Sequence, residues 1–153
     1  MELSAAQRER YERNLLVEGF TDRMQQALIA ARVAVVGAGG LGSAALNYLV
    51  AAGVGHLTLI ENDTVSLSNL QRQVLYTTAD MGRPKAEVAA MRLSRLNPGC
   101  DIRVVTDRLT AANAAGLLGG HDAVVDCTDN YDARYVIDDF CREAEVPMIY
   151  GTA

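Results

Sequence analysis

The sequence has no tryptophan, only two phenylalanines and only three prolines in 153 residues. Its cysteines, Cys100, Cys127 and Cys141, stand far apart and form no CxxC pair, so they predict neither a zinc site nor a disulfide framework. The formal net charge of −5 argues against a general affinity for nucleic acid or for an anionic membrane surface. Because the polar N-terminus lacks the apolar core of a signal peptide, we expect a reducing, cytoplasmic setting.

Lysine is also nearly absent. Lys85 is the only lysine, so the other 13 of the 14 basic residues are arginines. Either an arginine-biased codon usage explains this ratio, or the chain keeps one lysine where a compact point charge is needed. Lys85 is predicted to lie in the first turn of a helix, where a cation is unfavourable to the helix dipole. We therefore expect an anion near it.

Residues 33–60 contain no charged side chain, which allows two interpretations. A membrane span needs roughly 20 apolar residues, but the glycines of this run form two clusters, which indicate two turns. We favour strand, turn, helix, turn and strand, because buried parallel strands are continuously apolar. The strands are predicted over Val33–Val36 and His56–Ile60. The helix is predicted from residues that recur at helical spacing: Leu41, Ala44, Ala45, Tyr48, Leu49 and Ala52.

The first turn of this run predicts a nucleotide site. Gly37, Gly39 and Gly42 fit the dinucleotide fingerprint, with one glycine each for the tight turn, the approach of phosphate and helix–strand packing. Gly40 lies in the same turn. The helix that follows directs its free N–H groups at an anion. Glu61, at the end of the second strand, can hold ribose hydroxyls. The pattern predicts a nucleotide without identifying it.

The rest of the chain alternates strands and helices, which predicts a Rossmann-like, doubly wound α/β fold with a mostly parallel sheet, right-handed crossovers and helices on both faces. We expect this domain over residues 32–153, after an N-terminal helical extension over residues 1–31. Strands are predicted over Ile102–Thr106, Ala123–Asp126 and Met148–Tyr150. Helices are predicted over Ala5–Glu18, Asp22–Ala31, residues 84–96, Thr110–Leu118 and Tyr131–Glu145.

Polar residues follow several strands, and ligands of such folds bind beyond the carboxyl ends of the strands. The segment Asn62–Met81 is long for a strand–helix connection, and long connections are usually functional. We expect Leu67, Leu70, Val74 and Leu75 to hold it on the body. Lys85 and the turn Asp126–Asn130 should face the same crevice. In that turn we expect Asp126 to be structural, bonding the turn that follows it, and Cys127 and Cys141 to be inert apolar positions.

Four segments resemble the MoeB/ThiF/HesA family, kin of the ubiquitin-activating enzymes, and are most similar to its MoeB-type members. They are GAGGLG at Gly37–Gly42, SLSNLQRQ at Ser66–Gln73, GRPK at Gly82–Lys85 and DCTDN at Asp126–Asn130. The segment RYERN at Arg10–Asn14 is similar to the RYxRQ motif of that family. The resemblance covers nearly the whole chain, in the order and spacing of the family.

The resemblance implies that ATP and magnesium are bound, and that the C-terminal glycine of a small ubiquitin-like sulfur carrier is adenylated with release of pyrophosphate. Asp129 would bind magnesium, while Arg72 and Lys85 would contact the phosphates as solvent-accessible ligands. Asn69 and Gln73 would orient phosphate or metal-bound water. The family usually has aspartate where this chain has Glu61. Asp63 and Asn130 are also counted with the nucleotide-binding residues.

The resemblance also implies a homodimer in which Arg13 reaches the ATP of the partner. Family members usually continue beyond the fifth strand, often with two CxxC zinc pairs, and this chain has no zinc site of that kind. We therefore expect either a fragment or a naturally short form. Three alternatives stay open: a truncated nucleotide-binding or dimerisation module, an NAD-binding dehydrogenase domain, and a relative that adenylates another carboxylate, such as one on modified tRNA. The carrier and its pathway, molybdopterin, thiamin or another, are not specified.

Overall fold

The computed structural model describes residues 2–151, which form a five-stranded sheet in the order β3-β2-β1-β4-β5. Every neighbouring pair of strands is parallel, as the alternation of strands and helices predicts. The strands are β1 (Arg32–Val36), β2 (His56–Ile60), β3 (Asp101–Val105), β4 (Ala123–Asp126) and β5 (Met148–Tyr150). The order reverses between β1 and β4, so the crevice of a doubly wound sheet is expected at their carboxyl ends.

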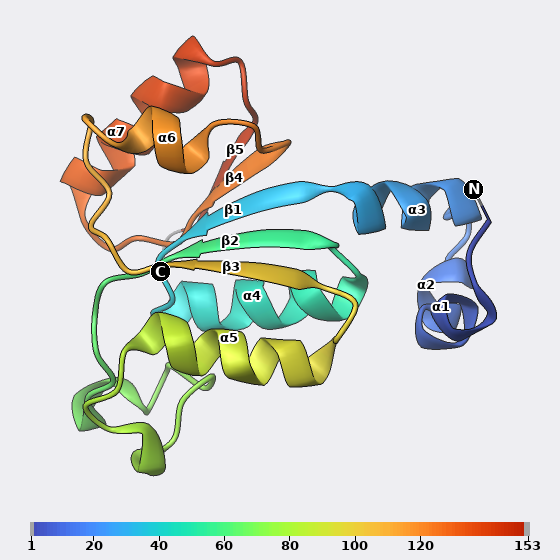
Figure 1. Ribbon diagram of the computed structural model, residues 1–153, viewed down its shortest axis with the longest axis horizontal. Coiled ribbons are helices and arrows are strands. Elements are labelled where there is room, and N and C mark those ends of the chain that lie inside the picture. Colours follow the sequence, from blue (N-terminus) through green and yellow to red (C-terminus); the bar gives the residue numbers. More distant parts are fainter. Residues whose placement is uncertain (1, 152–153) are drawn as a thin grey trace.

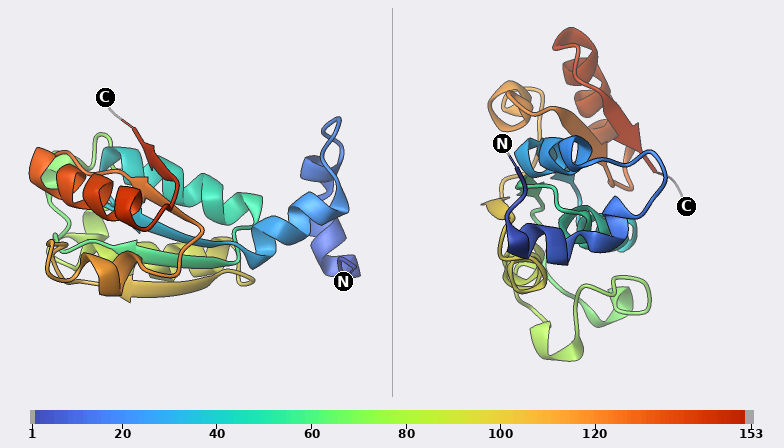
Figure 2. Two further views of the ribbon diagram at one scale, coloured as in Figure 1. Left: turned by 90° about the horizontal axis from the view of Figure 1, so that it is seen from above. Right: turned by 90° about the vertical axis from the view of Figure 1, so that its right-hand side faces the viewer.

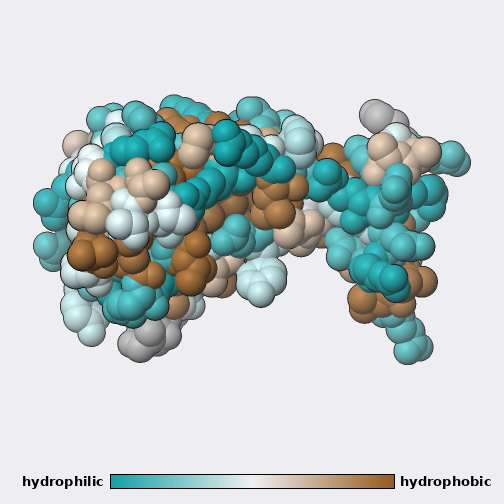
Figure 3. Space-filling model, turned by 90° about the horizontal axis from the view of Figure 1, so that it is seen from below, coloured by the Kyte–Doolittle hydropathy of each residue, from teal (hydrophilic) through white to brown (hydrophobic). Residues whose placement is uncertain are grey.

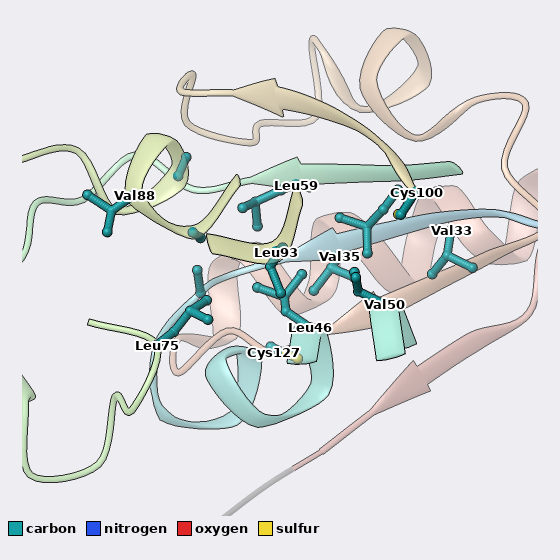
Figure 4. Packing of buried hydrophobic residues seen from close by; sticks show 14 of the residues in the cluster. Val33, Val35, Leu46, Val50, Leu59, Leu75, Val88, Leu93, Cys100 and Cys127 are labelled. Carbon is teal, nitrogen blue, oxygen red and sulfur yellow. The ribbon is translucent and has the colours of Figure 1, made fainter. Parts of the chain in front are cut away.

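Helices cover both faces of this sheet (Figure 1). One face carries α4 (Gly40–Ala52) and α5 (Lys85–Leu96), and the other carries α6 (Ala114–Leu118) and α7 (Tyr131–Glu143). Successive residues of a strand point to opposite faces, so β1 contributes to two apolar cores. One core contains Val35, Leu46, Leu59 and Leu93 (Figure 4), and the other contains Ala34, Val124 and Ile137.

The uncharged run 33–60 is β1, α4 and β2, which confirms the strand–helix–strand interpretation. Among residues 2–151, no helix is long and apolar enough to cross a membrane. The core-facing side of α4 is formed by Gly42, Leu46 and Val50. Tyr48, one of the residues that predicted the helix, is 77% exposed. Apolar spacing located the helix correctly but did not identify its buried side, because small residues lie on both sides of it.

The N-terminal extension consists of α1 (Ala5–Arg10), α2 (Glu12–Leu15) and α3 (Asp22–Ala30). The single helix predicted over Ala5–Glu18 is wrong, since the helix is interrupted at Tyr11. The Tyr11 ring is buried, and its hydroxyl accepts a hydrogen bond from Asn97 at 3.0 Å. The extension lies beyond the amino ends of the strands, away from the main body (Figure 2).

Two further helix boundaries differ from the prediction by more than one residue. The helix α6 begins at Ala114 rather than near Thr110, because the side chain of Asn113 accepts a hydrogen bond from the Thr110 N–H and forms a turn there. The helix α7 ends at Glu143, and the chain turns through Glu145 at a φ of 54°. The connection between β2 and α5 is largely irregular, as predicted, with two short 3-10 turns, η1 (Leu67–Asn69) and η2 (Thr78–Asp80).

Candidate functional site

A crevice of about 720 Å³ opens at the carboxyl ends of the strands. It brings together ten of the twelve residues predicted to bind the nucleotide, the phosphates or the metal. In chain order, these are Gly37, Gly39, Gly40, Glu61, Asp63, Arg72, Gln73, Lys85, Asp129 and Asn130. Gly42 and Asn69 do not line it. Gly42 is buried in α4, and the Asn69 side chain accepts a hydrogen bond from Ser66 at 2.8 Å.

The turn between β1 and α4 is shaped by glycine. Gly37 has a φ of 94°, and a Cβ atom there would lie 2.8 Å from the carbonyl oxygen of Cys127. At Gly42 a Cβ atom would overlap the carbonyl oxygen of Gly37, which explains the third glycine of the motif. Gly39 caps α4 without a side-chain hydrogen bond, so the first N–H groups of that helix have no side-chain cap. Such a helix start suits a phosphate.

Glu61 is fixed beside this turn by two backbone hydrogen bonds. Its Oε2 atom accepts from the Ala38 N–H and its Oε1 atom from the Asp63 N–H, both at 2.8 Å. A carboxylate offers about four acceptor positions, so two remain for other donors. The longer side chain of glutamate therefore still presents an acceptor in the crevice at the end of β2, where ribose hydroxyls are held in Rossmann folds.

Lys85 begins α5, and its side chain forms an ion pair with Asp63. The Nζ atom donates to Oδ2 of Asp63 at 2.5 Å, and Lys85 is only 3% exposed. The anion expected near this lysine is therefore Asp63. The hydrogen bond from the ammonium holds the pKa of the Asp63 carboxyl below its usual value, outweighing the effect of partial burial. The prediction of a solvent-accessible lysine is wrong, since the side chain is buried and paired with Asp63.

The β2–α5 connection is held by polar contacts more than by the predicted apolar ones. Leu75 is buried, whereas Leu67 and Val74 are 62% and 70% exposed, so the prediction is wrong for those two. The Tyr76 hydroxyl donates to the carbonyl of Ala38 at 2.9 Å and ties the segment to the glycine turn. Arg92 of α5 donates to the carbonyl of Leu75 and pairs with the buried Asp80.

Two side chains of this connection enter the crevice. Arg72 is exposed and runs beside the glycine turn, its Cδ atom 3.3 Å from where a Cβ of Gly40 would lie. Gln73 is 4% exposed. Its Oε1 atom has no hydrogen-bond partner. Among the described residues, no other buried side-chain nitrogen or oxygen atom lacks one. Unpaired buried polar atoms are rare in native structures, so this one points to a ligand, an ion or water in the crevice.

The turn after β4 contains two aspartates in different surroundings, one paired within the protein and one exposed to the crevice. Asp126 is fully buried and accepts hydrogen bonds from the Thr128 N–H at 2.9 Å and from Arg134 at 2.8 Å, so the structural role is confirmed. Asp129 is exposed at the crevice wall. The Asn130 side chain caps α7 by accepting from the Ala133 N–H at 2.9 Å.

Cys127 lies at the floor of the crevice and is 8% exposed. Burial, with a smaller effect of the neighbouring Asp126 charge, raises the pKa of its thiol to about 11. The thiol is therefore protonated at neutral pH and is a poor nucleophile. Cys141 is also buried, as expected. Within residues 2–151, no group of three acidic, histidine or cysteine side chains is arranged to hold a metal ion.

Sequence reasoning missed several residues that line the crevice. Arg134 follows Asn130 by one helical turn, and this i, i+4 spacing could have indicated that it faces the same side. It pairs with Asp126 and lies 5.2 Å from the centre of the Tyr150 ring. Arg108 and Leu109 follow β3, and their place after a strand end was the available signal.

Arg13 lies far from this crevice. It is exposed on α2, and the adjacent Asn14 donates to the carbonyl of Ala52 at the C-terminal end of α4. The crevice is at the N-terminal end of the same 13-residue helix. At 1.5 Å per residue, α4 separates the two by about 20 Å. Arg13 does not contribute to the site of its own chain in this structure.

The chain is similar to two curated adenylyltransferases. It is 49% identical over 152 residues to the molybdopterin-synthase adenylyltransferase of Salmonella typhimurium strain LT2, covering 99% of this chain and 61% of that protein. It is 42% identical over 144 residues to the sulfur carrier protein ThiS adenylyltransferase of Escherichia coli K12, covering 94% and 57%. This chain thus spans about three fifths of the length of these curated relatives.

Among solved structures, the chain is similar to the E. coli tRNA N6-threonylcarbamoyladenosine dehydratase TcdA in complex with ATP. The TM-score is 0.91 at 32% sequence identity, with 98% of this chain and 61% of that chain covered. The ThiF family profile matches residues 11–153, nearly the whole sequence. The resemblance that the glycine turn and the SNLQRQ and DCTDN segments indicate is confirmed by these matches: the chain belongs to the ThiF family.

Proposed function

We propose that this chain is the nucleotide-binding part of an ATP-dependent adenylyltransferase, which activates the C-terminal glycine carboxylate of a small ubiquitin-like sulfur-carrier protein. The observation that carries the proposal is the single crevice shared by the glycine turn, Glu61, Lys85 and Asp129. A dehydrogenase domain would account for the first two but gives no role to the others. The relative named for the sulfur carrier protein ThiS is 42% identical and the tRNA dehydratase 32%, which favours a carrier protein as substrate.

The reaction asks the protein mainly for positioning and charge neutralisation. An oxygen of the glycine carboxylate attacks the α-phosphorus of ATP and forms the acyl-adenylate. The bond between the α-phosphorus and the bridging oxygen breaks, and pyrophosphate leaves with its electron pair. No side chain has to form a covalent bond in this step, and the protonated thiol of Cys127 agrees with that.

Different residues of the crevice would bind different parts of the nucleotide. The start of α4 fits a phosphate because no side chain caps its first N–H groups, and Gly37 lets the turn before it pack closely against the Cys127 carbonyl. Glu61 would accept the ribose hydroxyls. Arg72, with its planar fork of donors, and Lys85, with its point charge, would bind the phosphates. Gln73 would gain a donor for its unpaired Oε1 atom, such as a water on the phosphates or the metal.

Magnesium fits the donor set at Asp129. This ion is usually held by one or two carboxylates together with substrate phosphates and water, and Asp129 is an exposed carboxylate beside the phosphate-binding turn. When bound, the ion would neutralise phosphate charge. Asp129 would anchor it, while Asp126 would keep the turn in place through Thr128.

A symmetric dimer would place Arg13 at the site of the partner. Arg13 is about 20 Å from its own crevice, and the extension that carries it exposes apolar side chains, as Figure 3 shows on that part of the surface. These are Leu16, Val17 and Met24, with 66%, 61% and 50% exposure. A two-fold interface uses the same surface of both copies, so each copy would lend its Arg13 to the other.

Isotope exchange between pyrophosphate and ATP tests the proposed function. We expect exchange that depends on magnesium and on a carrier with a free C-terminal glycine, and no exchange with a carrier that lacks this glycine. Nucleotide binding without exchange for any carrier would instead support the truncated binding module. The same assay tests the dimer by mixing Arg13→Ala with Asp129→Ala, each inactive alone. Half of the dimers should be mixed with one intact site each, so roughly a quarter of the activity returns.

A further inference from the structure

Asp63 and Lys85 form an ion pair in the lining of the crevice. The ammonium of Lys85 is almost completely shielded from solvent, while the Asp63 side chain is 62% exposed. Residues that pair across a surface usually keep both charged ends in water and gain little. Here the aspartate is accessible and the lysine is enclosed, so the carboxylate covers the cation.

Backbone hydrogen bonds place the two residues opposite each other. The Lys85 N–H donates to the carbonyl of Asp63 at 2.9 Å, and an isolated antiparallel bridge joins Thr64 to Pro84. The segment after β2 is therefore paired with the start of α5. This pairing lets the side chains of Asp63 and Lys85 meet on the same side, whatever ligand the crevice contains.

The Asp63 carboxylate is itself held in one orientation. Its Oδ1 atom accepts from the Thr64 N–H at 2.8 Å, which leaves Oδ2 for the lysine at 2.5 Å. Glu61 is held by different donors, the N–H groups of Ala38 and Asp63, and forms no ion pair with Lys85 among the described residues. A lysine side chain is long and flexible, and a fixed carboxylate restricts that freedom before any substrate binds.

We propose that Asp63 is a positioning residue, which fixes the ammonium of Lys85 in the crevice wall through a charged hydrogen bond anchored by the Thr64 N–H. It lets the chain place a cation at the start of α5, where the helix dipole disfavours one. An ammonium has three donors, so Lys85 keeps this bond and offers the others to a phosphate. The catalytic consequence rests on the function proposed above, whereas the positioning itself does not.

The single lysine makes the proposal measurable without any nucleotide. Reductive methylation with 13C-formaldehyde and a hydride reductant labels the lysine side-chain amine, in its neutral form, and the α-amino group, so the spectrum of this chain has one lysine signal and one internal reference. We expect slow labelling of Lys85 in the unaltered chain. Asp63→Asn and Asp63→Ala should each raise the rate about fivefold, the change that corresponds to a lost interaction of ~1 kcal/mol.

Matched variants distinguish a loss of Lys85 positioning from a general loosening of the fold. Asp107→Asn removes another carboxylate that lines the crevice but, among the described residues, forms neither a hydrogen bond nor an ion pair with Lys85, so it should leave the labelling rate unchanged. Asp63→Glu retains the charge and should restore part of the protection. Because Asp63 is largely exposed, the melting temperature should stay nearly constant in these variants. A labelling rate in Asp63→Asn equal to that of the unaltered chain would overturn the proposal.

Adenylation kinetics add a second readout. In Asp63→Asn we expect kcat to fall about tenfold while the dissociation constant of ATP–magnesium changes less than about threefold, because a cation that is present but misaligned loses transition-state contacts first. Unchanged kcat together with faster labelling would contradict the positioning role. If the unaltered chain binds no ATP, the proposed function fails while the labelling result still decides the role of Asp63.

Discussion

The two ends of the sheet are both rich in polar side chains, and they differ in how these side chains are paired. At the amino end, Asn97 and Gln25 are 1% and 0% exposed. Asn97 donates to Tyr11 and to the carbonyl of Val50, and Gln25 donates to the carbonyl of Ala52. These contacts attach the extension to the C-terminal ends of α4 and α5. In each of these hydrogen bonds, both the donor and the acceptor belong to the protein.

At the carboxyl end, the polar side chains surround an open crevice. Arg72 and Asp129 are exposed, and Gln73 keeps an unpaired acceptor although it is buried. Polar side chains therefore stabilise the fold at the amino end, whereas at the carboxyl end some remain available to a ligand. Pairing, rather than composition, distinguishes a structural polar network from a binding site.

Glycine substitutions should have the largest effects, and they compare the two ends directly. A Cβ atom at Gly55, near the amino end, would overlap the carbonyl of Ile29, and one at Gly42 would overlap that of Gly37. We expect Gly55→Ala and Gly42→Ala each to lower the free energy of unfolding by about 3 kcal/mol or more. Only Gly42→Ala should also remove stabilisation by ATP. Urea unfolding measures this, and Gly116→Ala, which meets nothing within 4 Å, is the neutral control.

The two buried amides provide the next comparison. Asn97→Ala leaves the groups of Tyr11, Val50 and Gly99 without partners, which should cost about 2–3 kcal/mol. Gln73→Ala removes a side chain whose acceptor is unpaired and should cost less than about 1 kcal/mol. The order is read from urea unfolding of both variants. Equal losses would mean that Gln73 is structural and that the two ends do not differ in this respect.

A third comparison lies within the β4–α7 turn. Asp126→Asn weakens a buried ion pair with Arg134 and should lower stability by about 2 kcal/mol. Asp129→Asn should change stability by less than about 0.5 kcal/mol while removing the magnesium dependence of nucleotide binding. Calorimetric titration of ATP with and without magnesium checks both variants. Loss of metal dependence in Asp126→Asn at full stability would show that the two roles are exchanged.

The smallest expected effect is a change in the free energy of unfolding at acidic pH. The pKa of Asp63 is lowered in the folded chain, so its ion pair contributes stability above the unfolded pKa of ~3.9 and loses it as pH falls through the folded value. Since the side chain is largely exposed, the contribution should stay within about 1 kcal/mol. The difference in unfolding free energy between the unaltered chain and Asp63→Asn should therefore shrink from pH 6 to pH 3. A difference that grows toward low pH contradicts this sign.

The crevice could be predicted from the sequence because its parts follow strand ends. The glycine turn, Glu61 and the DCTDN turn each come directly after a buried strand, and parallel strands bring their carboxyl ends together. The burial of Lys85 could not be predicted, because it depends on a bridge between Thr64 and Pro84, two residues far apart in the sequence without a local pattern.

The amino end was predicted less well for a similar reason. The first helix is interrupted at Tyr11, whose hydroxyl accepts a hydrogen bond from Asn97, 86 residues further along, and no local pattern indicates this contact. The exposed side of α4 was also missed, since alanines on both sides give no clear amphipathic signal there. Local patterns located elements and strand ends, whereas long-range polar pairing decided which side chains were left available.

The most direct measurement of the central claim is ligand-dependent unfolding of the unaltered chain. If the carboxyl-end crevice is an ATP–magnesium site, ATP–magnesium at a hundredfold excess over its dissociation constant should raise the free energy of unfolding by ~2.7 kcal/mol. NAD at the same concentration should leave it unchanged, and Arg72→Ala should lose the gain without losing stability. No gain with ATP–magnesium, or an equal gain with NAD, would contradict the account.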